Sequence, residues 1–241
     1  MRLSLAVAPV VVAALALAGS ARGGSLPMPD FPTDFAWGGP YVGLHFCGNV
    51  PCSVGTDYDN LTPFPGGLTA DTFALSGLLA GIYGGFNWQQ GQYVLGLDGE
   101  VDWTNLTGSQ DFSVFGGLVA GTMKLSSDWQ GSLKGRAGVL VTNALLLYGT
   151  AGVTAAHATV DVSGVDASGP GPFSASQSQL HLGGTLGLGT ELALTHDILV
   201  RGEVDYTSFA AQTYNFGLAQ FSPTSVRWDQ VTGTIGLAVK F

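Results

Sequence analysis

The sequence predicts an all-β fold: an eight-stranded antiparallel up-and-down transmembrane β-barrel with short periplasmic turns and long external loops. Three observations predict it. Only 10% of the 241 residues are charged, whereas a soluble protein typically has about 25%. Eight stretches alternate apolar and polar residues, as half-buried strands do. The connections between these stretches are alternately long and short, which is typical of outer-membrane barrels.

The alternating stretches have the length of membrane-spanning strands. Each has about 9–15 residues, close to the ~9–11 that a tilted strand needs to cross a bilayer. No apolar run after the N-terminal segment reaches the ~20 residues of a spanning helix. The expected strands cover roughly residues 40–48, 75–87, 93–105, 127–141, 145–160, 178–192, 198–209 and 227–241.

The connections differ strongly between the two ends of the predicted barrel. "WQQGQ", "TNA" and "LTHD" are tight turns, whereas the other connections are long and include the Gly-, Ser- and Pro-rich stretch "SGVDASGPGPFSAS". In lipid, only helices and closed barrels satisfy every backbone polar group. A soluble lipocalin-like barrel, with the charges outside, is the alternative, but so many apolar faces with so little charge favour the membrane.

Each strand pairs an apolar face with a polar face. In "YVLGLDGEVDW", Leu97 and Val101 share one side, and Asp98 and Glu100 share the other. The apolar face suits lipid and the polar face a polar lumen. The residues expected in the lumen are Asp98, Glu100, Asp102, Lys134, Arg136, Glu191, Arg201, Glu203 and Asp205. The aromatic residues expected in interfacial girdles are Trp37, Tyr41, Trp88, Tyr93, Trp103, Trp129, Tyr148, Tyr206, Trp228 and Phe241.

The charged lumen has two interpretations. It is either a packed polar plug or the selectivity ring of a pore; the narrow interior of eight strands favours the plug. Opposite charges directly across a ladder contribute about 0.2–1 kcal/mol each. The expected partners are Glu191 with Arg201, and Lys134 and Arg136 with Asp98 and Glu100.

The N-terminus has the layout of a secretory signal peptide. Arg2 precedes the apolar run "LSLAVAPVVVAALALA", and small residues follow. Cleavage after Ala18, Ser20 or Ala21 fits, and an uncleaved membrane anchor is the alternative. The predicted organisation is a signal peptide at 1–21, an N-terminal linker at 22–36 and an outer-membrane barrel at 37–241.

Cys47 and Cys52 enclose the turn-forming "GNVP". In an exported chain we expect a disulfide between them at the mouth of the first external loop; two free thiols are the alternative. The sequence predicts no metal site, because zinc requires about four ligands. A net charge of −9 with eight scattered Lys and Arg argues against nucleic acid.

No cofactor or enzymatic activity is expected. The four histidines lack metal-ligand spacing, and no Ser, His and acid set has a spacing that suits catalysis. A barrel enzyme that modifies lipids is the alternative. The glycine-rich stretches are strand glycines rather than phosphate loops.

The mature chain resembles the small eight-stranded outer-membrane barrels of Gram-negative bacteria, and most of all the porin-like surface-antigen family of alphaproteobacteria. The resemblance lies in "WGGPYVG", "GGFNWQQGQYVLGLDGEVDW", "WQGSLKGRAGVLVTNALLLYGTAGV", "LGLGTELALTHDILVRGEVDY" and the terminal "GLAVKF". Pro40, the ending Val-Lys-Phe and the cysteine pair depart from the family pattern.

The resemblance implies that Phe241 is part of a strand signal read by the outer-membrane assembly machinery. The expected location is the cell outer membrane, with its lipid as surroundings and with host or surface ligands at the external loops. The expected role is structural and surface-interacting: membrane integrity and display of loops. The alternative is a narrow porin that passes small hydrophilic solutes.

Overall fold

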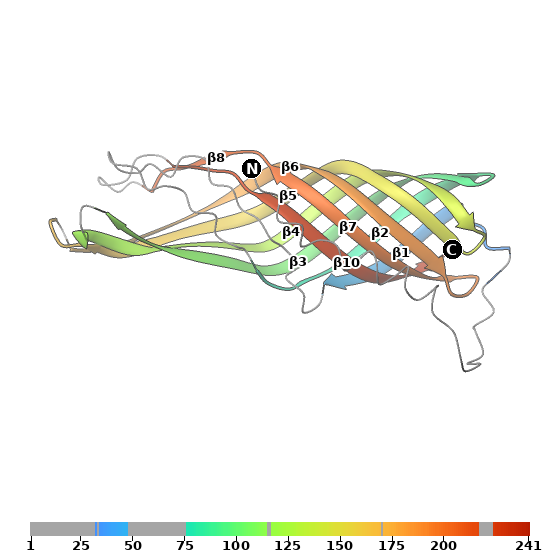
Figure 1. The fold of residues 1–241 in the computed structure, drawn as a ribbon, viewed down its shortest axis with the longest axis horizontal. Coiled ribbons are helices and arrows are strands. Elements are labelled where there is room, and N and C mark those ends of the chain that lie inside the picture. The colour runs from blue at the N-terminus through green and yellow to red at the C-terminus, as the bar shows by residue number, and fades with distance from the viewer. Residues whose placement is uncertain (1–31, 33, 48–75, 115–116, 170, 217–223) are drawn as a thin grey trace, which may run out of the picture.

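Eight long antiparallel strands close into a barrel in the computed structural model, which describes residues 32, 34–47, 76–114, 117–169, 171–216 and 224–241 (Figure 1). Their order around the barrel is β1-β10-β7-β6-β5-β4-β3-β2. The predicted all-β barrel is confirmed. The barrel strands are β1 (Gly39–Cys47), β2 (Leu79–Gln90), β3 (Tyr93–Val114), β4 (Val119–Thr142), β5 (Leu145–Asp166), β6 (Gly171–Ala193), β7 (Ile198–Phe209) and β10 (Asp229–Lys240).

The first and last barrel strands close the ring. β1 pairs with β10 from Tyr41 opposite Lys240 to Phe46 opposite Ile235. This pairing leaves the ring without an open edge, as lipid requires. Among the residues that the structure describes, no helix has the length and apolar character to cross a membrane.

The strands have two lengths, and this differs from the sequence prediction. β3 to β6 have 22 to 24 residues, whereas β1, β2, β7 and β10 have 9 to 12. The outer parts of β3 to β6, residues 104–114, 119–128, 158–166 and 171–179, project beyond the ring and are called the external sheet here (Figure 1). Much of the external sheet was expected to be loop, because its Gly and Ser content is typical of loops. Backbone pairing overrides that local preference.

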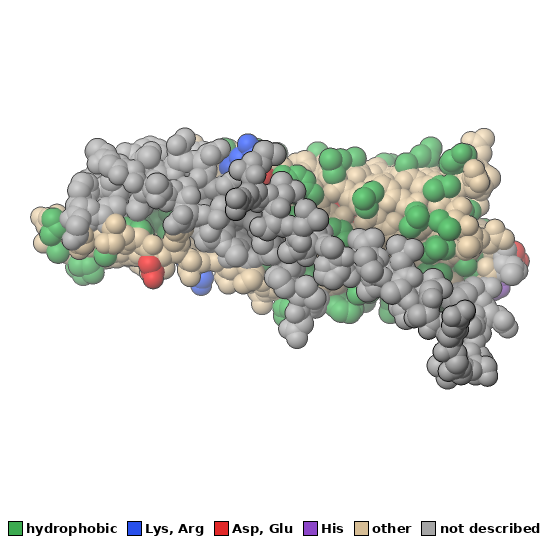
Figure 2. All heavy atoms as spheres, viewed as in Figure 1, with side chains coloured by type: hydrophobic (Ala, Val, Ile, Leu, Met, Phe, Trp, Pro, Cys, Tyr) green, Lys and Arg blue, Asp and Glu red, His purple; other side chains and the backbone are tan. Residues whose placement is uncertain are grey.

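Along the long strands, the apolar side chains change from the outer face in the barrel to the inner face in the external sheet. In the barrel, Leu97 and Leu186 are exposed outward and polar side chains point inward. In the external sheet, Leu125 and Val160 are buried on the inner face, while hydroxyl side chains such as Ser174 are exposed. Figure 2 shows hydrophobic side chains on the barrel surface in the half away from the external sheet. The inversion indicates that the barrel lies in lipid and the external sheet in water.

One row of outward-facing residues marks the level at which the outer face changes from apolar to polar. Trp103 lies opposite Trp129, Trp129 opposite His157, and His157 opposite Leu180. Aromatic residues concentrate at the boundary of a membrane, so this row sets the outer limit of the lipid. The expected girdle is only partly correct: Trp37, Tyr41, Tyr148 and Trp228 are buried inside, whereas Trp88, Tyr93, Trp103, Trp129, Tyr206 and Phe241 are exposed.

A short hairpin covers the inner face of the external sheet. It consists of β8 (Gln212–Tyr214) and β9 (Thr224–Val226), which pair antiparallel. Tyr214, Val226 and Trp228 pack in one apolar cluster with inward residues of the sheet. The external part of the molecule therefore has its own hydrophobic core.

Candidate functional site

The lumen of the barrel is the candidate site, and its short-turn end is closed by the N-terminal segment. Trp37 is 1% exposed. Its Nε1 donates to the carbonyl oxygen of Asn143 at 3.0 Å, and its backbone N–H donates to Oε1 of Gln89 at 2.8 Å. Phe35 packs edge-on against the Trp37 ring. Phe35 falls in the stretch expected to be a linker, and it is buried in one apolar cluster with Trp37 and Tyr41.

Two arginines and two carboxylates form a charged layer above this closure. Glu191 accepts hydrogen bonds from Arg136 Nη1 at 3.0 Å, Arg136 Nη2 at 2.9 Å and Arg201 Nε at 2.8 Å. Arg201 Nη2 donates to Oδ2 of Asp98 at 2.7 Å. The Tyr41 hydroxyl also donates to Asp98, at 2.9 Å. Buried charges are stable only with such pairing, so this layer is a fixed structure rather than a solvated ring.

The ion pairs cross the lumen more often than they follow the strand ladder. Glu191 and Arg201 are register partners, as the sequence suggested. The other expected pairing is correct for Lys134, which lies opposite Asp98 and bonds Glu100. It is wrong for Arg136, which lies opposite Gly96 and bonds Glu191. Long side chains on the inner wall of a narrow barrel reach distant strands, and ladder register does not predict those contacts.

Lys134 is the centre of a second group. It is 0% exposed, and its Nζ donates to Glu203 at 2.6 Å, Glu100 at 3.0 Å and Asp205 at 3.2 Å. The Tyr148 hydroxyl donates to Glu203 at 2.5 Å. Three carboxyl groups from two strands therefore share one ammonium group.

Aromatic rings fill the space between the charges. The Arg136 guanidinium lies 4.0 Å from the centre of the Tyr148 ring, and Arg201 lies 4.0 Å from that of Tyr83, both within cation–π range. A Cβ atom at Gly189 would collide with the Tyr148 ring. The sequence analysis did not identify these tyrosines as lumen residues; their position on the polar face of the alternation was the available signal.

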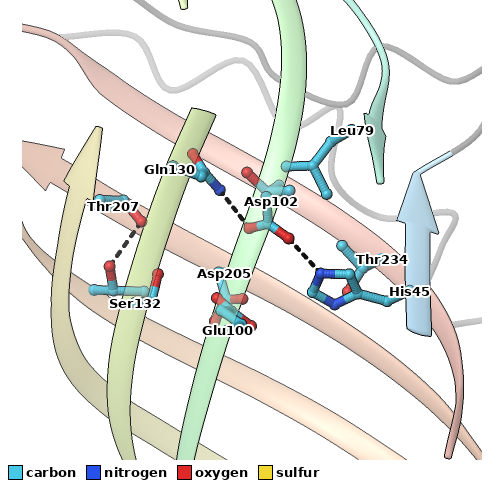
Figure 3. Close-up of a pocket in the computed structure, with 11 residues that line it drawn as sticks. His45, Leu79, Glu100, Asp102, Gln130, Ser132, Asp205, Thr207 and Thr234 are labelled. Atoms are coloured by element: carbon cyan, nitrogen blue, oxygen red, sulfur yellow. Dashed lines mark hydrogen bonds and ion pairs between the residues drawn. The ribbon is translucent and has the colours of Figure 1, made fainter. Parts of the chain in front are cut away.

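A layer of hydroxyl, amide, imidazole and carboxyl side chains continues outward around a small cavity (Figure 3). His45 Nε2 lies 2.5 Å from Oδ1 of Asp102, and Gln130 donates to Oδ2 of Asp102 at 3.1 Å. The cavity has a volume of about 10 Å³, room for about one water molecule. Glu100 and Asp205 also line it.

The outer end is closed by the apolar cluster under the β8–β9 hairpin. His181 is completely buried there: Nε2 lies 2.8 Å from the Tyr214 hydroxyl and Nδ1 lies 3.3 Å from the carbonyl oxygen of Ala210. A carbonyl oxygen only accepts, so Nδ1 carries the proton and Nε2 accepts from Tyr214. Burial raises the pKa of Tyr214 to about 12. Side chains thus fill the described lumen at both ends and in between.

Other expected site residues lie at the margins of the described chain. Cys47 ends β1 and is buried, whereas Cys52 lies outside the described residues, as does the expected signal peptide. The disulfide stays a prediction. Phe241 follows β10; its N–H donates to the carbonyl oxygen of Pro40 at 3.1 Å, and its side chain is 73% exposed.

Comparisons with known proteins agree with this architecture. The family model described as "Outer membrane protein beta-barrel domain" matches residues 5–224. The chain is 30% identical over 160 residues to a 22 kDa outer membrane protein of Rhizobium leguminosarum bv. viciae, a match that covers 66% of this chain and 64% of that relative. It is 26% identical over 220 residues to a 25 kDa outer-membrane immunogenic protein of Brucella melitensis, which covers 90% of this chain and 85% of the relative.

Among solved structures, the chain is similar to the outer membrane protein OprG of Pseudomonas aeruginosa, with a TM-score of 0.49 and 14% identity over 88% of this chain and 99% of that one. It is also similar to Neisserial surface protein A, with a TM-score of 0.43 and 13% identity over 84% and 97%. The family match covers most of the sequence. The chain therefore belongs to the outer membrane protein β-barrel domain family, whose location is the outer membrane.

Proposed function

We propose that this outer-membrane barrel is a closed structural anchor that holds the external sheet at the cell surface and does not pass solutes. The filled lumen is the observation that carries the proposal. Trp37 blocks the short-turn end, the Lys134 and Arg201 networks fill the middle, and Trp228 lies in the apolar cluster at the outer end. A conducting pore needs a continuous hydrated path.

The external sheet supports a role in surface interactions. Its apolar inner face is covered by the β8–β9 hairpin, so it is a folded platform with its own core. Its outer face exposes polar side chains, including Ser174 and Lys124. A rigid platform loses less entropy on binding than a flexible loop does. We infer that host or surface ligands bind here rather than in the lumen.

Swelling of proteoliposomes tests the closed lumen. Vesicles containing the folded protein should not swell in small sugars or amino acids, whereas vesicles with an open porin should. Swelling that changes when Lys134→Gln alters the middle of the lumen would support the narrow porin instead. A gel shift between unboiled and boiled samples verifies that the barrel has folded.

Export and assembly complete the proposal. Residues 1–21 act as a cleaved signal peptide, supported by Arg2 and the apolar run that follows. Cys47 and Cys52 form a disulfide in the oxidising periplasm. The assembly machinery reads the last strand, and the exposed side chain of Phe241 at its end is accessible to it. N-terminal sequencing of membrane-inserted protein tests cleavage: an intact Met1 would contradict it.

A further inference from the structure

The lumen contains more carboxyl groups than positive groups. Its described residues supply one lysine and two arginines, all buried, together with His45. Six carboxyl side chains face them, and each of these is at most 13% exposed. The positive residues are Lys134, Arg136 and Arg201; the carboxyl residues are Asp98, Glu100, Asp102, Glu191, Glu203 and Asp205.

The excess of carboxyl groups over positive groups is located around Lys134. Arg136 and Arg201 are matched by Glu191 and Asp98. His45 and Asp102 pair with each other at 2.5 Å. What remains is Lys134 with three carboxyl groups, an excess of two negative charges if all three are ionised.

The three carboxyl groups on Lys134 are not equivalent. Glu203 accepts hydrogen bonds from Lys134 and Tyr148, and it lies 3.8 Å from Arg201. Two hydrogen-bond donors and a second nearby cation therefore stabilise the charge of Glu203. Glu100 has Lys134 as its sole cation within 4.0 Å among the described residues.

Asp205 is in a similar position to Glu100. Within the part of the chain that the structure describes, its one other polar contact besides Lys134 is a weak one with the Thr150 hydroxyl at 3.5 Å. Both carboxyl groups face the small cavity, where Asp102 adds a further negative group and His45 is already paired (Figure 3). No described cation compensates the pair from the opposite wall.

We propose that Glu100 and Asp205 retain a proton between them at neutral pH. Burying an unpaired carboxylate costs several kcal/mol. When like charges share a site, one of the groups keeps its proton instead. The lipid belt around the barrel excludes bulk water, and the cavity holds about one water molecule at most. The proton therefore lowers the excess of negative charge around Lys134 from two to one.

This proton makes barrel stability depend on pH. Ordinary carboxyl groups of the unfolded chain are ionised above about pH 6. The folded protein then binds more protons than the unfolded chain, so the folded state loses stability as pH rises. Each retained proton raises the unfolding equilibrium constant about tenfold per pH unit until the folded pair loses it.

The double variant Glu100→Gln with Asp205→Asn tests the proposal. Both amides have the shape of a protonated carboxyl group, and the remaining Lys134–Glu203 pair is balanced. Both proteins are unfolded with denaturant in lipid vesicles between about pH 6 and 8. The unfolding equilibrium constant of the wild type should rise about tenfold more per pH unit than that of the double variant. Asp98→Asn is the matched control, because it removes a carboxylate that Arg201 compensates. This control variant should be less stable than the wild type at every pH, and its stability should depend on pH as that of the wild type does.

Infrared spectroscopy of the wild-type protein gives a readout that needs no variant to fold. At neutral pH we expect the C=O stretching band of a buried protonated carboxyl group, which disappears at alkaline pH. The band should be absent from the double variant and present in Asp98→Asn. No such band in the wild type would overturn the proposal. So would a double variant that is as unstable as Asp98→Asn and keeps the wild-type pH slope.

Discussion

Replacing Leu186 by arginine tests which side of the barrel faces lipid. Leu186 is 63% exposed on the outer face of β6 and lies halfway between Leu180 in the boundary row and Leu192 near the short turn. About 20 Å of strand separates it from either boundary, at about 3.3 Å per residue. An arginine there cannot reach water. The expected loss of stability is about 2–4 kcal/mol, a thirtyfold to thousandfold rise in the unfolding equilibrium constant.

The matched control is Ser174→Arg, on the same strand and the same outward face but in the external sheet. Ser174 lies beyond the boundary row, so an arginine there stays in water. Its effect should fall within about 0.5 kcal/mol of zero. Both variants are unfolded with denaturant from lipid vesicles, and tryptophan fluorescence follows the transition. Equal costs at the two positions would refute the assigned lipid boundary, and a tolerated Leu186→Arg would mean that the barrel faces are inverted.

Three further variants test other parts of the structure. Arg136→Ala leaves Glu191 with one cation and should lower the free energy of unfolding by about 3–5 kcal/mol, because breaking a buried ion pair leaves a buried charge without its partner. Denaturant unfolding measures this loss, and a loss below about 1 kcal/mol would contradict a packed network. Trp228→Ala should lower the stability of the external sheet by about 3–5 kcal/mol through lost packing, and it should expose the β8–β9 hairpin to proteases. The barrel should keep its gel shift. Unchanged protease resistance would count against an external core. Phe241→Ala should fold nearly normally into detergent but assemble poorly in cells; equal defects in both settings would leave Phe241 as a packing residue.

The alternation of side chains predicted the barrel wall well. Leu97 and Asp98 are adjacent, and the period of two alone placed Asp98 in the lumen and Leu97 on the lipid side; Asp98 is 0% exposed and Leu97 is 53% exposed. Glu191 and Arg201 were predictable as partners because a tight turn fixes their register.

The contacts across the lumen were not predictable in the same way. Lys134 reaches Glu203 and Asp205 on β7, although its ladder neighbours are β3 and β5. Which inward residues meet depends on strand tilt and stagger, which one sequence does not specify. The external sheet was missed because its Gly- and Ser-rich composition is typical of loops. The inverted alternation there, with Leu125 and Val160 buried inward, was the signal that identifies it.

Single-channel recording in planar bilayers tests the closed lumen most directly. The folded wild-type protein, with insertion verified by its gel shift, should produce no current steps, because side chains from Trp37 to Trp228 leave no continuous water path in the described lumen. Stable current steps whose ion selectivity changes with Lys134→Gln would contradict this account and identify a narrow, charged pore.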